Sequence, residues 1–207
     1  MRARTALPLV AAVLLVVTGC STGSSTAAGS FGFVSPGGRT EITYDPPSTR
    51  GTIGPLAGVD LLEDTPLAVA DFAGEVVVLN LWGQWCGPCR AEADDLEEVA
   101  EATAGLGVQL LGINVRDPQR DKAQDFVRDR AVTYPSIYDP SMRTLAALGG
   151  DYPTSVIPST IVLDRQHRVA AIFLRALTAE DLLPVVQRIA AEPPESSASS
   201  EPSGSGS

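Results

Sequence analysis

The chain has 207 residues and a formal net charge of −10, with 15 Lys and Arg against 25 Asp and Glu. This acidic balance argues against a protein surface that binds nucleic acid or anionic lipid, because both partners are recognised mainly through positive charge. About 140 residues remain between two low-complexity ends, enough for one domain with a single core.

The N-terminal segment has the pattern of a bacterial lipoprotein signal. Two arginines within the first four residues precede an apolar stretch over 6–17 that is too short to span a bilayer comfortably. The segment Val-Thr-Gly-Cys over 17–20 resembles a lipobox, which predicts a signal peptide over 1–19 and a lipid on Cys20. The alternatives are an ordinary signal peptide with an unrelated cysteine and an uncleaved membrane anchor. All three place the domain outside the cytoplasm, where disulfides persist.

Two further segments are expected to lie outside the domain. Residues 20–50 are rich in Ser, Thr, Gly and Pro, which predicts a flexible tether. Residues 192–207 are mostly Pro, Ser, Glu and Gly, which predicts a disordered tail. The folded domain is therefore expected over residues 51–191.

Within that domain the hydrophobic patterns predict alternating strands and helices of an α/β fold. The strand–helix–strand order implies a right-handed crossover between parallel strands, whereas the short turn after residue 164 demands an antiparallel pair. Pro184 is expected to kink the last helix. In chain order, the expected elements are a hairpin-like start over 56–62, a buried strand over 76–82, a helix from Cys86 to about 103, a strand over 108–115, a helix opened by Asp117 and Pro118, a short helix over 141–148, strands over 159–164 and 168–174, and a helix from Thr178 to about 191.

The most informative motif is Trp-Cys-Gly-Pro-Cys over 85–89, because two thiols three positions apart can close into a reversible disulfide. Cys86 is expected at the helix N-terminus with Cys89 one turn deeper, and Pro88 starts the helix after Gly87 without losing a needed donor. Unpaired N–H groups and the helix dipole stabilise a thiolate there, so the pKa of Cys86 should lie below its free value of about 8.5. We therefore expect Cys86 to be the exposed, attacking sulfur and Cys89 to resolve the mixed disulfide.

Two simpler roles for the cysteine pair are disfavoured. A zinc site needs four ligands, and the rest of the chain offers Cys20 and His167. An inert structural disulfide would close a ring of four residues, which constrains little of the unfolded chain.

From about residue 51 to 191 the chain resembles the thioredoxin superfamily, and in particular the membrane-tethered thiol-disulfide oxidoreductases of the ResA, TlpA and CcmG type. The resemblance rests on Gly-Glu-Val-Val-Val-Leu-Asn-Leu-Trp-Gly-Gln-Trp-Cys-Gly-Pro-Cys-Arg over 74–90 and on Ile-Pro-Ser-Thr-Ile-Val-Leu-Asp over 157–164. It implies a thioredoxin fold, a central mixed sheet flanked by helices, with the N-terminal hairpin and inserted helix of TlpA-like proteins. No cofactor is implied.

The resemblance also implies site residues. Pro158 would be a cis-proline facing the cysteines, with Ile157 offering its backbone to a substrate strand; a trans proline that merely begins the strand is the alternative. Asn80 stands where cytoplasmic thioredoxins have a proton-relaying Asp, so another acid is needed. Glu92 lies on the helical face of Cys89 and matches the Glu that ResA-like proteins place near their cysteines. If it is partly buried, its pKa rises and it can exchange a proton with Cys89; the alternative is a solvated first-turn acid.

These observations predict an extracytoplasmic, lipid-anchored oxidoreductase that acts on protein dithiols and disulfides. Reduction is favoured because Gly87 and Pro88 match the dipeptide of reducing thioredoxin. The resemblance implies apocytochrome c thiols as the client, in cytochrome c biogenesis, and a membrane electron donor of the CcdA or DsbD type. Trp85 is expected to shield the site with its ring edge. A general disulfide oxidase or isomerase is the alternative.

Two other functions need features that the chain lacks. A copper chaperone of the Sco type has three residues between its cysteines and a distal histidine near them, whereas this chain has two residues between them and His167 at a predicted turn. A thiol peroxidase needs a Pro-x-x-x-Thr-x-x-Cys pocket, which is not present around Cys86.

Overall fold

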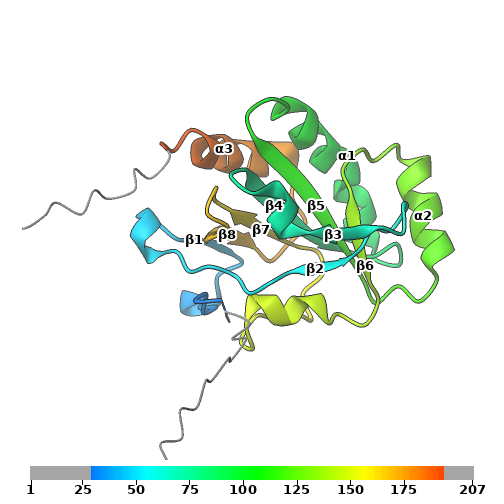
Figure 1. Ribbon diagram of the computed structural model, residues 1–207, viewed down its shortest axis with the longest axis horizontal. Helices are drawn as coiled ribbons and strands as arrows, with labels where there is room; N and C mark the ends of the chain where they lie inside the picture. The colour runs from blue at the N-terminus through cyan, green and yellow to red at the C-terminus, as the bar shows by residue number, and fades with distance from the viewer. Residues whose placement is uncertain (1–28, 194–207) are drawn as a thin grey trace, which may run out of the picture.

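A mixed β-sheet forms the centre of the protein in the computed structural model, which describes residues 29–193 (Figure 1). Within those residues six strands are ordered β1-β8-β7-β4-β5-β6. Strand β4 runs parallel to β5, and β5 to β6, whereas β7 is antiparallel to β4 and β8. The strands are β1 Glu41–Thr43, β4 Val76–Trp82, β5 Val108–Val115, β6 Ser136–Asp139, β7 Ser159–Leu163 and β8 Val169–Phe173.

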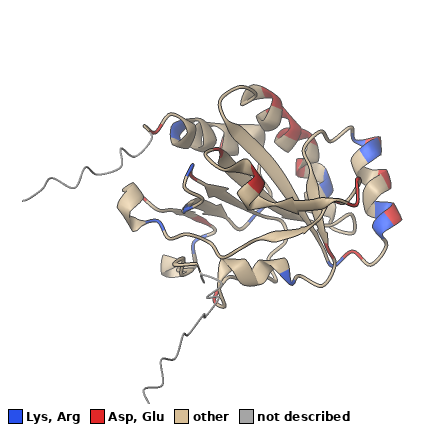
Figure 2. Ribbon diagram, in the orientation of Figure 1, with Lys and Arg blue, Asp and Glu red and all other residues tan. Residues whose placement is uncertain are grey.

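The sheet is covered on both faces, which is why β4 is buried along its whole length. Successive side chains of a strand point to opposite faces. Val76 and Val78 pack under helices α1 (Gly87–Ala102) and α3 (Ala179–Ala190), while Val77 and Leu79 pack in a second cluster with the 3₁₀ helix η4 (Thr144–Leu148). Helix α2 (Arg120–Asp129) packs near the end of β4, and Figure 2 shows acidic residues along α1 and both signs of charge on α2. Shorter 3₁₀ helices are η1 Pro36–Gly38, η2 Pro47–Thr49 and η3 Val69–Phe72.

A hairpin of β2 (Ala57–Val59) and β3 (Pro66–Ala68) covers the free edge of β6. It is longer than the hairpin-like start predicted over 56–62. The Leu61 backbone N–H donates to the Ser136 carbonyl oxygen at 2.7 Å, and the Leu61 side chain is fully buried in the cluster that contains Cys86 and Cys89. The hairpin therefore reaches the edge of the sheet where the redox motif lies.

The predicted tether over 20–50 is wrong for residues 29–50. Strand β1 pairs with β8, and Phe31 and Ile42 are buried. Arg50 is buried and forms ion pairs with Asp164 at 3.1 Å and Glu192 at 2.6 Å. Removing one partner of a buried ion pair typically lowers the free energy of unfolding by about 3 to 5 kcal/mol. The strand pairing and these ion pairs make residues 29–50 part of the folded domain.

The predicted terminal segments are placed only in part. Glu192, expected in the disordered tail over 192–207, instead pairs with Arg50. The predicted signal peptide over 1–19, the lipidation site Cys20 and positions 21–28 and 194–207 lie outside the described residues. Among residues 29–193 no helix is long and apolar enough to cross a membrane.

Three other sequence predictions change in the structure. Helix α2 has Gln119, not Asp117, at its N-cap position. The helix expected over 141–148 is the short 3₁₀ helix η4, and strand β6 was not predicted. The capping box of α3 is present, because Thr178 Oγ1 accepts the Asp181 N–H at 3.3 Å and Asp181 accepts the Thr178 N–H at 3.1 Å. Pro184 lies inside α3, which continues to Ala190.

Candidate active site

The cysteine pair lies at the carboxyl end of β4, where the chain turns directly into α1. Cys86 is the N-cap residue of α1 and Pro88 lies in its first turn. The structure contains the Cys86–Cys89 disulfide, and the Cys86 sulfur accepts the Cys89 backbone N–H at 3.2 Å. An N–H donated to sulfur at a helix start stabilises a thiolate once the disulfide is opened. The lowered pKa of Cys86 stays a prediction.

The register of β7 places a proline loop against the cysteines. Because Leu81 of β4 pairs with Ser159 of β7, the residues before Ser159 lie beside the end of β4. The Ile157–Pro158 peptide bond is cis, and the Ile157 carbonyl oxygen lies 3.9 Å from the Cys86 sulfur. Pro158 is buried and Ile157 is half-buried. The structure thus brings Ile157 and Pro158 next to Cys86, where an extended substrate segment could pair with the Ile157 backbone.

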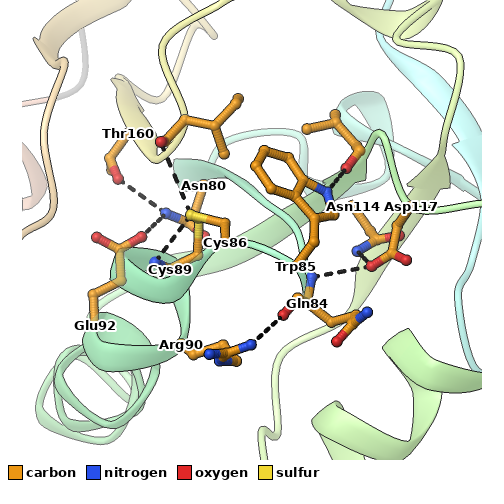
Figure 3. The surroundings of a disulfide bond; sticks show 12 residues. Asn80, Gln84, Trp85, Cys86, Cys89, Arg90, Glu92, Asn114, Asp117 and Thr160 are labelled. Carbon is orange, nitrogen blue, oxygen red and sulfur yellow. Dashed lines mark hydrogen bonds between the residues drawn. A yellow bond between two sulfur atoms is a disulfide. The ribbon is translucent and has the colours of Figure 1, made fainter.

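Glu92 is buried beneath α1, with 2% of its surface exposed. One carboxylate oxygen accepts the Asn80 amide at 2.9 Å (Figure 3), and the other accepts the Leu177 backbone N–H at 3.0 Å. Burial raises the pKa of Glu92 to about 7, although these hydrogen bonds oppose the rise. Glu92 is therefore not a solvated first-turn acid, and it gains or loses a proton near neutral pH.

Asn80 is hydrogen-bonded to this acid and lies on a cavity that Cys89 also lines. Its position in β4 points it to the face covered by α1, where its amide donates to Glu92 and, at 3.2 Å, to Thr160 Oγ1. Asn80 also lines a small cavity together with Cys89 and Tyr134. Burial raises the pKa of Tyr134, which keeps its hydroxyl protonated. Glu92 is therefore hydrogen-bonded to a residue that lines the same cavity as Cys89.

Exposure does not distinguish the two sulfurs. Cys86 and Cys89 are each 4% exposed, so the expectation of an exposed Cys86 is wrong for the disulfide form. Leu61 of the hairpin and Ile157 of the proline loop pack in the same cluster and cover the pair. The helix N-cap position and the contact with Ile157, not accessibility, distinguish Cys86 from Cys89.

Trp85 and Asp117 lie on the other side of the disulfide from Glu92 (Figure 3). Trp85 is 43% exposed and offers an aromatic surface at the site. Asp117 was predicted to cap the next helix, but its carboxylate instead accepts the backbone N–H of Gln84. The parallel pairing of Trp82 with Asn114 sets the end of β5 beside this loop. The predicted strand pairing was the one signal in the sequence for this contact of Asp117, because the carboxyl ends of adjacent parallel strands meet at one edge of the sheet.

His167 is remote from the cysteines. Strand β7 leads away from Pro158, and the turn that carries His167 follows its far end. The His167 Nε2 atom lies 3.1 Å from the Phe72 carbonyl oxygen. Among the described residues, no three His, Cys, Asp or Glu side chains gather in a way that could hold a metal ion.

The fold and the Cys-x-x-Cys site define an enzyme of the thioredoxin-like thiol-disulfide oxidoreductase class. The sequence matches the profile of the AhpC/TSA family over residues 55–172, and the chain belongs to that family. It is 30% identical over 121 residues to thiol-disulfide oxidoreductase ResA of Geobacillus thermodenitrificans, a match that covers 58% of this chain and 67% of the relative.

Two solved structures extend the comparison. A secreted thiol-disulfide isomerase from Corynebacterium glutamicum is 51% identical, with a TM-score of 0.76 over 80% of this chain and 100% of the other. A DsbF homologue from Corynebacterium diphtheriae is 53% identical, with a TM-score of 0.72 over 76% of this chain and 98% of the other. The chain is therefore ResA-like in sequence, with thioredoxin-like structural relatives that include a secreted enzyme.

Proposed function

We propose that this enzyme reduces disulfides of proteins outside the cytoplasm. The observation that carries the proposal is a redox disulfide at a helix start, facing the Ile157–Pro158 loop and backed by the buried acid Glu92. The loop supplies a place for a substrate backbone, and the acid supplies a proton acceptor of suitable pKa.

The chemistry follows in two exchanges. The Cys86 thiolate attacks one sulfur of the substrate disulfide, which breaks that bond and releases the other substrate sulfur as a thiolate that takes a proton. Cys89 then loses its proton, and Glu92, as a carboxylate, is the proposed final acceptor of that proton. The Cys89 thiolate then attacks Cys86, and the first substrate sulfur leaves as a thiolate. The substrate gains two electrons, and the enzyme ends with the Cys86–Cys89 disulfide.

The reduction potential tests the direction. The Gly-Pro dipeptide matches that of thioredoxin, so we expect a potential of about −270 mV, measured by thiol alkylation after equilibration in glutathione or dithiothreitol buffers. A potential above about −200 mV would overturn the reductase proposal in favour of an oxidase or isomerase.

Isomerisation is the second candidate, supported by the 51% identity to the secreted thiol-disulfide isomerase. The two functions differ in their need for Cys89, because rearranging a disulfide consumes no electrons whereas reducing one does. A Cys89→Ala variant that still reactivates scrambled ribonuclease would favour isomerisation. A variant that loses this activity together with insulin reduction would favour the reductase.

The proposed client and donor rest on the resemblance to ResA-type proteins. We infer that apocytochrome c thiols are the client and that a membrane protein of the CcdA or DsbD type returns two electrons to the Cys86–Cys89 disulfide. Each turnover leaves the enzyme oxidised, so some dithiol donor is required by the balance of electrons.

We propose a lipid anchor on Cys20 at the extracytoplasmic face of a bacterial membrane, with 1–19 as the signal peptide. Acyl chains bind a bilayer with about 0.8 kcal/mol per buried CH₂, so two or more chains hold a protein firmly. Cys20→Ser is expected to move the enzyme from the membrane fraction to the soluble fraction while the thiol-disulfide activity remains. A wild-type protein already found in the soluble fraction would contradict the anchor.

A further inference from the structure

The loop that leads into the cysteine pair is held by groups outside the Cys-x-x-Cys motif. Asp117 Oδ2 accepts the Gln84 backbone N–H at 3.0 Å, and Arg90 donates to the Gln84 carbonyl oxygen at 2.9 Å (Figure 3). The Trp85 indole N–H donates to the Val115 carbonyl oxygen at 3.0 Å. The loop backbone and the exposed indole are therefore both tied to the end of β5.

Asp117 is the buried member of this arrangement. It is 1% exposed, and among residues 29–193 no basic side chain forms an ion pair with it. Its other hydrogen bond comes from the Asn114 amide at 3.3 Å, and Asn114 Oδ1 is buried without a partner in the described part of the chain. Burying a carboxylate costs free energy unless hydrogen bonds compensate. The shorter of these two bonds goes to the loop before Cys86.

A glycine ties the indole to the same loop. A Cβ added at Gly83 would overlap the Trp85 indole nitrogen and its ring carbons. The ring therefore lies against the Gly83 backbone, and its place depends on the path of the loop. Cys86 donates its N–H to the Gly83 carbonyl oxygen at 3.0 Å, but it also has an anchor outside this loop, because it is the N-cap residue of α1.

We propose that Asp117 is a positioning residue for exchange with protein substrates. Its carboxylate fixes residues 83–85, so that the Trp85 indole forms one wall of the docking surface while Ile157 forms the other. The inference rests on the proposed exchange at Cys86, but not on its direction. Asp117 does not touch the reacting sulfurs, so it acts through Gln84 and Trp85.

Three variants test this role. Asp117→Ala removes the acceptor, whereas Asp117→Asn keeps one oxygen that can accept both the Gln84 N–H and the Asn114 amide, as Asp117 Oδ2 does. Asp139→Ala is the matched control, because Asp139 is also a buried carboxylate at the carboxyl end of a strand and accepts the Arg143 and Thr144 backbone N–H groups at 3.0 and 2.7 Å. Its loss should destabilise the fold without touching the loop at the cysteines.

Each reduced variant is mixed with insulin and, separately, with 5,5′-dithiobis(2-nitrobenzoic acid), at a temperature where circular dichroism shows it folded. For Asp117→Ala we expect the insulin rate constant to fall roughly 10- to 100-fold and the small-disulfide rate constant to change less than about twofold, since misplacement of about 1 Å has such effects on a docked reaction. Asp117→Asn and Asp139→Ala should keep both rates near those of the wild type.

Gly83→Ala provides a second route if Asp117→Ala does not fold, because it displaces the indole without altering Asp117. It should reproduce the selective loss with insulin. Three results would each overturn the positioning role. The first is an insulin rate constant for Asp117→Ala equal to that of the wild type, and the second is an equal loss in Asp117→Ala and Asp139→Ala. The third is an insulin rate constant for Asp117→Asn as low as that for Asp117→Ala. A wild-type enzyme that reacts with the small disulfide but not with insulin would overturn the proposed function instead.

Discussion

Replacing Cys89 with alanine is expected to arrest the enzyme as a mixed disulfide through Cys86 and to reduce net insulin reduction to the uncatalysed rate. The substitution keeps the backbone N–H of residue 89, which the Cys86 sulfur accepts at 3.2 Å, so the attacking thiolate keeps its stabilising contact. The resolving sulfur is lost, so the adduct persists. Non-reducing electrophoresis followed by mass spectrometry of the adduct measures the trapping and identifies the client.

The matched variant is Cys86→Ala, which leaves Cys89 as the single thiol of the pair. It should trap no client, because residue 89 lies within the first turn of α1 while Cys86 contacts Ile157. The two cysteines are equally buried in the disulfide form, so accessibility cannot produce this difference. Equal trapping by both variants would show that the roles of nucleophile and resolver are assigned wrongly. Recovery of proteins other than cytochromes would reject the proposed client but not the exchange.

The strands next to the site were predictable because their patterns are local. The bounds 76–82 and 108–115 expected from the sequence are those of β4 and β5, since continuous β-branched runs indicate strands buried on both faces. Strand β1 was missed because only its middle residue is buried and its partner β8 lies more than 120 residues away. The ion pairs of Arg50 with Asp164 and Glu192 likewise depend on the finished fold.

The candidate site also contains residues that local sequence predicts and features that depend on the finished fold. Cys86, Cys89 and Pro158 are marked by short motifs, and Glu92 follows from helical spacing and the resemblance. The burial of Glu92 depends on Leu177, and the role proposed for Asp117 depends on the register between β4 and β5. Such features arise where distant segments meet, so sequence spacing alone assigned Asp117 to a helix cap that it does not form.

Replacing Glu92 with glutamine is expected to remove a pH-dependent part of the stability of the oxidised protein. Burial raises the pKa of Glu92 from 4.5 to about 7, so the folded state binds this proton more tightly than the unfolded state. Stability from this group is therefore fully present below pH 4.5 and is lost as pH rises towards 7. The loss is about 3 kcal/mol. Urea unfolding at pH 5 and pH 8 measures it.

The glutamine can fit the same place. Its oxygen can accept the Leu177 N–H. If the Asn80 side-chain amide turns over, the Asn80 oxygen can accept both the N–H of the introduced glutamine and the Thr160 hydroxyl. The control is Glu98→Gln, which removes the same charge from the exposed face of α1. The difference between pH 5 and pH 8 should shrink in Glu92→Gln and stay unchanged in Glu98→Gln. An unchanged difference in Glu92→Gln would mean that another group carries it.

The same substitution should slow the resolving step. In the wild type, a Glu92 carboxylate accepts the Cys89 proton, so resolution should slow as pH falls below about 7, the pKa to which burial raises this group. Glutamine cannot accept that proton, and general-base assistance typically contributes about 10²- to 10⁴-fold. Stopped-flow measurement of mixed-disulfide decay from pH 5 to 9 should therefore show a slower step in Glu92→Gln and no inflection near 7. Because Cys86 attack does not use this proton, the rate of mixed-disulfide formation should be unchanged; equal slowing of both steps would indicate a general loss of active-site structure.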